Sequence, residues 1–275
     1  MWQRIVNWEN VYSNSPNIPR GADWPGAWVG PAEDFRARML DAGRVRLGLR
    51  YGDAARNVFD LYMPEGEVRG LVVFVHGGFW MALDQSYWAH LAQGPLSHGF
   101  AVAFPTYTLA PEARLSRITL EIGQAIGAAA SLIEGPVHLA GHSAGGHLVT
   151  RMVCADSPLP PDLRARIGRV LSISGLHDLR PLQRTSRAEA LGLLDDAEAL
   201  AESPALQRPL DGVQLICWAG AMETSEFLRQ NALLGSIWLG CGAATRIEVE
   251  PDRHHFNICD GLMDPDHPMV TSLLG

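Results

Sequence analysis

The sequence lacks any long apolar run. None of its uninterrupted apolar segments approaches the roughly 18 residues that a membrane-spanning helix requires. The N-terminal stretch MWQRIVNWENVYSN has no apolar core of the kind found in secretory signals, so we expect no such signal. Basic runs are also absent and the formal net charge is −8, which disfavours binding to nucleic acid or to an anionic membrane surface.

Cysteine is scarce, and its spacing suggests no site. The sequence contains no CxxC motif, and its four cysteines are scattered through the second half of the chain: Cys154, Cys217, Cys241 and Cys259. This spacing disfavours a zinc site. We therefore expect reduced, mostly buried thiols in a cytoplasmic protein.

The sequence does contain a regular alternation of strand and helix patterns. Its 275 residues, 47% hydrophobic and 19% charged, suit a single α/β domain. Continuous apolar runs typical of doubly buried strands are separated by helical patterns, which predicts a mostly parallel central sheet of about eight strands with helices on both faces. The first two strands are expected to form an antiparallel edge. The predicted strands are 44–52, 57–64, 70–78, 100–107, 136–142, 169–175, 213–220 and 244–250, and the predicted helices are 85–97, 114–133, 144–155, 224–239 and a terminal segment.

Two segments fall outside this alternation. Residues 13–31 are rich in proline, glycine and tryptophan, and we predict that they form no regular element. Because four of the eight tryptophans lie before residue 29, we expect residues 1–40 to be an arm packed on the domain, either as a strap over the core or as one wall of a pocket. Residues 179–209 are predicted to form a small helical cap over the carboxyl ends of the strands, where open α/β sheets bind ligands.

The segment GHSAGGH, residues 141–147, carries the first candidate catalytic residue. Gly141, Ser143 and Gly145 fit the pattern G-x-S-x-G, between an apolar strand pattern and a helical pattern. A sharp strand-to-helix turn needs small residues on both sides of the serine, and the helix N-terminus favours developing negative charge. We therefore predict that Ser143 is a nucleophile; the alternative is a glycine-rich turn with a spectator serine.

Two histidines flank this serine, but neither is predicted to be its base. In hydrolase folds that use this turn, the acid and then the base follow the serine along the chain. His142 occupies the position of the turn that points away from the nucleophile, and His147 lies a helical turn further on. The base is instead expected in the loop after the last strand, where His254 and His255 both qualify.

Three carboxylates compete for the role of the acid. Glu223 comes first after the strand at 213–220 and is favoured, while Asp178 and Glu226 are its rivals. The acid would fix the tautomer of the histidine and stabilise the imidazolium, which glutamate can do as well as aspartate.

Donors for an oxyanion are expected from two loops. The segment HGGFW follows an apolar strand directly, and its glycines would let a substrate approach the backbone closely. We predict that Gly77 and Gly78 supply N–H groups from this loop and that Ala144 supplies another. His76 is expected to hold the loop in place rather than to react.

A group of histidines and carboxylates near the C-terminus raises the question of a metal. Adjacent residues of an extended chain point in opposite directions, so His254 and His255 are poor joint ligands. The stretch MDPDHP, with Asp264, Asp266 and His267, is typical of a turn before a helix. We therefore predict no metal and no cofactor.

Four segments together resemble a known family. HGGFW, GHSAGGH, GAMETSEFLRQN and HHF are similar to the arylformamidase (kynurenine formamidase) group of α/β-hydrolases, near the hormone-sensitive-lipase-like esterases, and the likeness runs from about residue 50 to 260. Many esterases share HGG and G-x-S-x-G, whereas Trp80 and the stretch ETSEF point more narrowly to the formamidases. In that group the acid opens a similar D-S-P-E-F stretch and the catalytic histidine precedes a phenylalanine, which supports Glu223 and His255. The departures are glutamate for the usual aspartate, and His254 where an acidic residue is common.

The resemblance implies an α/β-hydrolase fold and hydrolysis of an N-formyl aryl amine such as N-formylkynurenine, in tryptophan breakdown. A formyl group needs little space, which bulky Phe79 and Trp80 beside the oxyanion loop would leave, and Trp24 or Trp28 would line an aromatic wall. A short-chain carboxylesterase fits the same residues. A different class, a ligand-binding protein that has lost catalysis, is the third hypothesis. We expect a small-molecule substrate and leave open whether the chain forms a homodimer.

Overall fold

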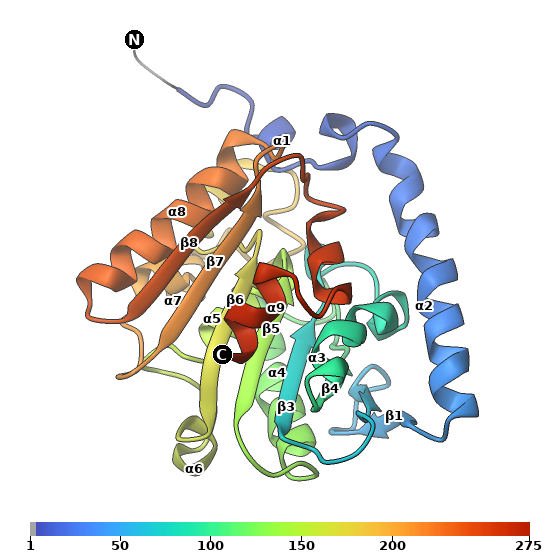
Figure 1. Cartoon of the computed structure of the whole chain (residues 1–275). Helices are drawn as coiled ribbons and strands as arrows, with labels where there is room; N and C mark the ends of the chain where they lie inside the picture. The colour runs from blue at the N-terminus through green and yellow to red at the C-terminus, as the bar shows by residue number, and fades with distance from the viewer. Residues whose placement is uncertain (1–3) are drawn as a thin grey trace.

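An eight-stranded sheet runs through the molecule (Figure 1). In the computed structural model, which describes residues 4–275, the strand order is β1-β2-β4-β3-β5-β6-β7-β8. β2 pairs antiparallel with both β1 and β4, and all other neighbours are parallel. The predicted α/β fold, with its mostly parallel sheet and antiparallel edge, is thus confirmed. The strands are Val45–Arg50 (β1), Val58–Tyr62 (β2), Gly70–Val75 (β3), Phe100–Pro105 (β4), Val137–His142 (β5), Ile167–Ile173 (β6), Gln214–Gly220 (β7) and Ala244–Glu250 (β8).

The sheet separates two hydrophobic cores, and strand β3 contributes to both. Leu71, Val73 and Val75 belong to the core that also contains residues of α4, α5 and α8, while Val72 and Phe74 belong to the core with α2, α3 and α9. Successive strand residues point to opposite faces, so a strand buried on both faces must be apolar throughout. The helices are Trp24–Asp41 (α2), Gln93–Ser97 (α3), Leu115–Ala130 (α4), Ala144–Arg151 (α5), Ser225–Gly240 (α8) and Pro268–Leu274 (α9).

The prediction that residues 13–31 form no regular element is wrong for their second half. Helix α2 begins at Trp24, and Pro25 lies in its first turn, where a missing N–H costs no helical hydrogen bond. Pro31 lies inside the helix and costs about 3 kcal/mol. Burying a large side chain contributes about 1.5–3 kcal/mol. The buried face outweighs the proline because it carries three such residues, Trp28, Phe35 and Met39, together with the small Ala32.

Short elements form most of the connections. The short α-helices are Trp8–Val11 (α1), Pro161–Arg164 (α6) and Asp196–Ala201 (α7). The 3-10 helices are Ser15–Asn17 (η1), Gly21–Asp23 (η2), Gln85–Tyr87 (η3), Ala89–Ala92 (η4), Arg180–Arg184 (η5), Pro204–Leu206 (η6) and Ile258–Met263 (η7). None of the helices within residues 4–275 combines the length and apolar character needed to cross a bilayer.

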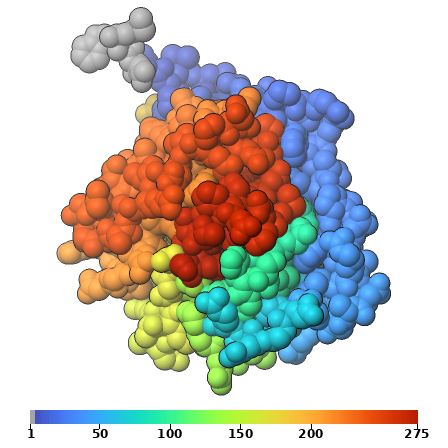
Figure 2. Space-filling view, in the orientation of Figure 1, coloured from blue at the N-terminus to red at the C-terminus, as the bar shows by residue number. Residues whose placement is uncertain are grey.

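The segment 179–209 between β6 and β7 packs on helix α4 through two buried carboxylates. Glu198 accepts a hydrogen bond from the N–H of Ser116 at 2.9 Å, and Glu202 accepts one from Thr119 Oγ1 at 2.6 Å. On the opposite side of the sheet, the N-terminal and C-terminal parts of the chain meet at the surface (Figure 2). Both arrangements pack segments against one another that are far apart in the sequence.

Candidate active site

The loops after four strands meet at the carboxyl edge of the sheet. Strands β3 and β5 are parallel neighbours, so the HGGFW loop lies against the turn that carries Ser143. A methyl group placed on Gly77 would lie 3.1 Å from Ser143 Cβ. Glu223 follows β7 and His255 follows β8, and these strands are also parallel neighbours. The sheet topology therefore gathers residues that are far apart in the sequence.

Ser143 lies in a strained turn between β5 and α5. Its backbone has φ 56° and ψ −116°, in a region that L-residues rarely adopt. Glycines make the turn possible, because a methyl group on Gly141 would collide with the carbonyl of Gly145, and one on Gly145 would collide with the carbonyl of Val75. Helix α5 begins at Ala144, so the serine lies at a helix N-terminus, where negative charge is favoured.

Glu223 and His255 form a hydrogen-bonded pair. His255 Nδ1 lies 2.7 Å from Glu223 Oε2, and both side chains are buried. The other carboxylate oxygen accepts hydrogen bonds from the N–H of Gly220, at 2.8 Å, and from the hydroxyl of Ser174. Because both of its oxygens form hydrogen bonds, the carboxylate has a fixed orientation. It occupies Nδ1 of the histidine, so Nε2 is free to bind other partners.

The rival carboxylates lie in other ion pairs. Asp178 Oδ1 lies 2.8 Å from Arg180 Nε. Glu226 Oε1 lies 2.7 Å from Arg229 NH2 and accepts the hydroxyl of Tyr12 at 2.6 Å. Among the described residues, neither carboxylate forms a hydrogen bond or ion pair with the imidazole of His255, so of the three candidates only Glu223 can orient it.

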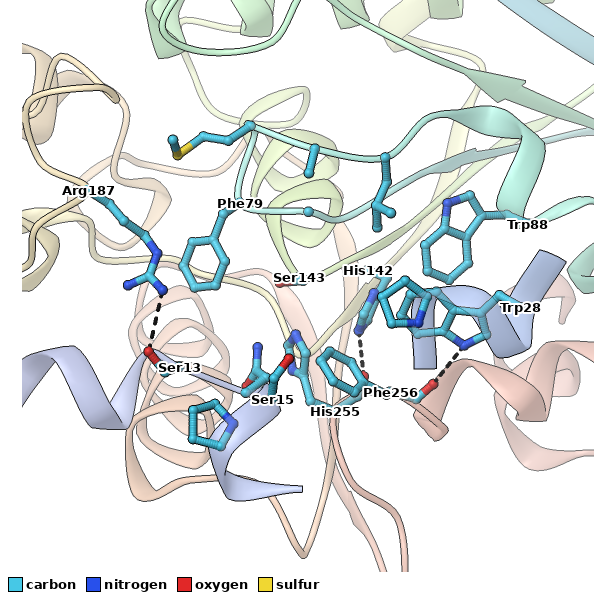
Figure 3. Close-up of a pocket in the computed structure, with 17 residues that line it drawn as sticks. Ser13, Ser15, Trp28, Phe79, Trp88, His142, Ser143, Arg187, His255 and Phe256 are labelled. Carbon is cyan, nitrogen blue, oxygen red and sulfur yellow. Dashed lines mark hydrogen bonds between the residues drawn. The ribbon is translucent and has the colours of Figure 1, made fainter. Parts of the chain in front are cut away.

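Ser143 and His255 line the same cavity, which has a volume of about 490 Å³ (Figure 3). No hydrogen bond between the serine hydroxyl and the imidazole is formed in the described part of the chain. In unliganded sites this bond is often long and tightens only when substrate binds. Phe227 packs on the imidazole of His255 with ring centroids 4.3 Å apart, which limits the movement of the imidazole.

The two histidines beside the serine are both held in other contacts. His142 Nε2 donates to the carbonyl of His255 at 2.8 Å, and His147 Nε2 donates to the carbonyl of Glu202 at 2.7 Å. Since a carbonyl can only accept, these nitrogens carry the ring protons. Burial lowers the pKa of His147 to about 3 and lowers that of His142 well below its usual value. His142 therefore supports the loop of His255, and His147 lies in the core.

The HGGFW loop offers unpaired backbone donors. Within residues 4–275, no acceptor is recorded for the N–H groups of Gly77, Gly78, Phe79 or Ala144. Gly78 and Phe79 have φ of 105° and 52°, so the loop follows a path that ordinary extended backbone cannot take. His76 is buried beneath it, with its ring stacked on Tyr107 at 4.5 Å, and burial lowers its pKa to about 4.

Only some of the predicted aromatic residues line the cavity. Phe79 and Trp28 do, and Trp28 Nε1 donates to the carbonyl of Phe256 at 3.3 Å (Figure 3). The expectation for Trp80 is wrong: it is fully buried and packs on His147, because left-handed backbone at Phe79 and Trp80 directs the second side chain into the core. Trp24 does not line the cavity either; it packs on His254 with ring centroids 4.9 Å apart.

Several cavity residues were not predicted individually, although a pocket wall formed by the N-terminal arm was one of the two expectations for residues 1–40. Residues 13–16 form part of the wall, together with Trp88, Phe256 and Arg187. The composition of the arm suggested a wall, but the two serines and the asparagine of that stretch, and Arg187, carry no motif that would single them out. Ser174, which holds Glu223, could have been suspected because it is a polar residue directly after the apolar strand β6.

The C-terminal histidines and carboxylates have separate partners. His267 Nε2 lies 3.4 Å from Glu250 Oε1, and Asp264 Oδ1 accepts the N–H of Asp266 at 2.9 Å. In the described chain, no three side chains of histidine, cysteine, aspartate or glutamate are grouped so that they could hold a metal ion.

Comparisons with known proteins agree with this geometry. A model of the alpha/beta hydrolase family matches residues 72–259. The chain is 26% identical over 280 residues to a kynurenine formamidase of Danio rerio, covering 97% of this chain and 94% of the relative. It is also 26% identical over 252 residues to a kynurenine formamidase of Salmo salar, covering 87% and 83% of the two chains. The resemblance to the arylformamidase group is thus confirmed.

Solved structures give a second set of relatives. A protein of Silicibacter sp. TM1040, described as a candidate thioesterase, is 46% identical, superposes with a TM-score of 0.91, and covers 97% of this chain and 98% of its own. Esterase B of Lactobacillus rhamnosis is 18% identical, with a TM-score of 0.65 and coverage of 92% and 91%, which shows a shared fold. Together the relatives support a hydrolase of the α/β type.

Proposed function

Because the chain belongs to the alpha/beta hydrolase family, we propose that it is a serine hydrolase that cleaves an N-formyl aryl amine, such as N-formylkynurenine, through an acyl-enzyme. One observation carries most of this proposal. The buried Glu223–His255 pair, 2.7 Å between Oε2 and Nδ1, shares a cavity with a serine held in a strained strand-to-helix turn. A nucleophile, then an orienting acid and then a base, in this chain order, is the arrangement of the hydrolytic triad in α/β-hydrolases.

In the first half of the reaction, Ser143 Oγ attacks the formyl carbon and its proton passes to Nε2 of His255. The carbonyl π electrons move onto the formyl oxygen, where the free N–H groups of Gly77, Gly78 and Ala144 are available as donors. Glu223 keeps the proton on Nδ1 and stabilises the imidazolium. Collapse of the intermediate breaks the C–N bond as His255 gives its proton to the arylamine nitrogen.

In the second half, water repeats the sequence. His255 takes a proton from water, the resulting hydroxide attacks the formyl ester of Ser143, and the serine leaves with the proton from His255. The products are the free arylamine and formic acid, which loses its proton to solvent to give formate, and the enzyme returns to its starting protonation state. The histidine must therefore act once as base and once as acid in each half-reaction.

The cavity supports a substrate with an aromatic group. Its wall includes four aromatic side chains, Trp28, Phe79, Trp88 and Phe256, and its volume of about 490 Å³ falls in the range of small-molecule sites. Likeness to kynurenine formamidases over nearly the whole chain favours the formyl amide over other acyl compounds.

An ester or thioester hydrolase is the second candidate. The observation in its favour is the 46% identity to the Silicibacter protein described as a candidate thioesterase, a higher identity than that to the formamidases. The same triad would serve, because only the leaving group changes, from an arylamine to an alcohol or thiol.

A comparison of substrates distinguishes these candidates. We expect kcat/KM to be highest for N-formylkynurenine, lower for p-nitrophenyl acetate and lower still for S-phenyl thioacetate, with Ser143→Ala as the blank for each. Rapid turnover of the ester or thioester with none of the formamide would transfer the assignment to the second candidate. No Ser143-dependent turnover of any of the three would favour a binding protein.

A further inference from the structure

The cavity has one permanently charged side chain in its described lining, Arg187. In Figure 3 it lies at one end of the view, beyond Phe79, while Trp28 and Trp88 lie at the other end. Ser143 lies between them in this view. A substrate that fills the cavity would therefore meet an aromatic surface at one end and a cation at the other.

Arg187 is held in position by two segments. Its guanidinium carbon lies 4.7 Å from the ring centroid of Phe79. NH1 lies 2.7 Å from Glu9 Oε1, and NH2 donates to Ser13 Oγ at 3.4 Å. A guanidinium stacked on an aromatic ring is oriented before a ligand arrives, so little freedom is lost on binding.

The guanidinium retains donors for a ligand. It has five N–H groups, and among residues 4–275 only Glu9 and Ser13 accept from it. Its side chain is 25% exposed, so it is partly desolvated but still reached from the cavity. A planar fork of donors at the end of an otherwise uncharged cavity fits a carboxylate better than any neutral group.

We propose that Arg187 is a specificity-determining residue that selects substrates with a carboxylate at the end remote from the scissile bond. The inference rests on the proposed hydrolase function and narrows its substrate class to formamides and esters whose leaving group carries a carboxylate. It assigns a role in substrate choice to the cap segment 179–209, which supplies this residue from outside the sheet.

Glu9 should weaken the binding of anionic substrates to Arg187. The N–H of Ser186, together with the charge of Arg187, holds the pKa of Glu9 below its usual range, so Glu9 is ionised at neutral pH and competes with a substrate carboxylate. Removing the charge of Glu9 should therefore strengthen binding of anionic substrates, whereas removing the charge of Arg187 should weaken it. These opposite signs distinguish recognition of charge from a general effect on the cavity.

The test uses pairs of substrates that differ only in charge. One set contains N-formylanilines that bear a carboxylate, or the matching carboxamide, on an ortho chain of zero to three methylenes. A second set contains formate esters of 4-hydroxyphenylacetate and of its amide. For the wild-type chain we expect the carboxylate to be preferred over the carboxamide by about tenfold in kcat/KM for at least one spacing, mainly through KM.

Three variants are compared with wild type. Arg187→Met should bring the ratio of carboxylate to carboxamide close to one, and Glu9→Gln should raise it severalfold. Arg184→Met is the matched control, because Arg184 also belongs to the cap and lies 5.5 Å from the ring centroid of Trp8, but does not line this cavity. It should leave the ratio at the wild-type value. Added salt should reduce the wild-type ratio.

The proposal is overturned if wild type shows no preference for the carboxylate at any spacing, or if Arg187→Met lowers both members of a pair equally. If Arg187→Met does not fold, the Glu9→Gln and salt measurements decide. The two substrate sets separate this inference from the proposed function. If the chain cleaves the esters with a preference for the carboxylate but does not cleave the formamides, the role of Arg187 is supported and the formamidase assignment is rejected.

Discussion

The catalytic edge of the sheet and the wall of the cavity are built in different ways. At the edge, Ser143, Glu223 and His255 each follow a strand closely, and the strand order determines which loops meet. The wall combines residues 13–16 with the cap residue Arg187 and with loops from the middle of the chain. In the proposed mechanism, the chemistry depends on residues that the sheet positions, and the choice of substrate depends on packing between distant segments. Changes at the edge should slow every substrate, whereas changes in the wall should alter preference among substrates.

The largest effect is expected at Ser143. Ser143→Ala removes the nucleophile but leaves the oxyanion donors, so turnover should fall by about 10⁴-fold or more rather than to zero. The measurement is kcat for N-formylkynurenine and for p-nitrophenyl acetate, with thermal unfolding to verify the fold. A variant that keeps a tenth of the activity would remove the basis for the mechanism.

His255 should come next. His255→Ala should approach the loss seen for Ser143→Ala, because the two act as a unit. His142→Ala and His147→Ala should chiefly lower the melting temperature, since each removes a buried hydrogen bond to a carbonyl. If folded His142→Ala lost as much activity as His255→Ala, the assignment of His255 as the base and His142 as a supporting residue would be contradicted.

Glu223→Gln tests the acid. We expect turnover to fall by about a hundred- to ten-thousandfold, because the amide cannot stabilise the imidazolium and can impose the wrong tautomer on His255. Asp178→Asn is the control, since Asp178 pairs with Arg180 and not with the imidazole. Equal losses in the two variants would argue against Glu223 as the acid.

Buried histidines beneath the catalytic edge should make stability depend on pH. Burial lowers the pKa of His76 and His177 to about 4, and that of His147 to about 3. Unfolding returns each to about 6.5, so between pH 6.5 and about 4 the unfolded state binds more protons and the folded state loses stability as the pH falls.

When the pH is lowered from 7 to 5, each of these histidines should reduce the free energy of unfolding by about 2 kcal/mol. Urea unfolding at the two pH values measures the change. In His177→Gln, the drop in the free energy of unfolding between the two pH values should be about 2 kcal/mol smaller than in wild type. An unaltered pH dependence would mean that burial does not keep His177 neutral.

Substitution of Phe79 should have the smallest effect on turnover and should mainly change the preference among acyl groups. If its ring limits the acyl side, Phe79→Ala should raise kcat/KM for butyryl relative to acetyl esters by about tenfold, because relief of overpacking is worth about 1–3 kcal/mol. The ratio is measured with p-nitrophenyl esters. A uniform drop for both esters would instead assign Phe79 to holding the oxyanion loop.

The same contrast explains what the sequence could reveal. Strand β3 was predictable because a doubly buried strand must be apolar throughout, and the strand-turn-helix context of Ser143 is local. Helix α2 was not, because its stability comes from burying Trp28 against loops far along the chain. The opposite orientations of Phe79 and Trp80 depend on left-handed backbone that no residue pattern signals, and Arg187 lies in an ordinary polar stretch.

Covalent labelling tests the central claim most directly. A fluorophosphonate reacts much faster with an activated serine than with other side chains, so intact mass and peptide mapping of the wild-type chain should show one adduct, on Ser143. Labelling should be absent in Ser143→Ala and strongly slowed in His255→Ala, while Arg184→Met should label at the wild-type rate. An adduct on a different residue, or undiminished labelling of Ser143→Ala, would contradict the account.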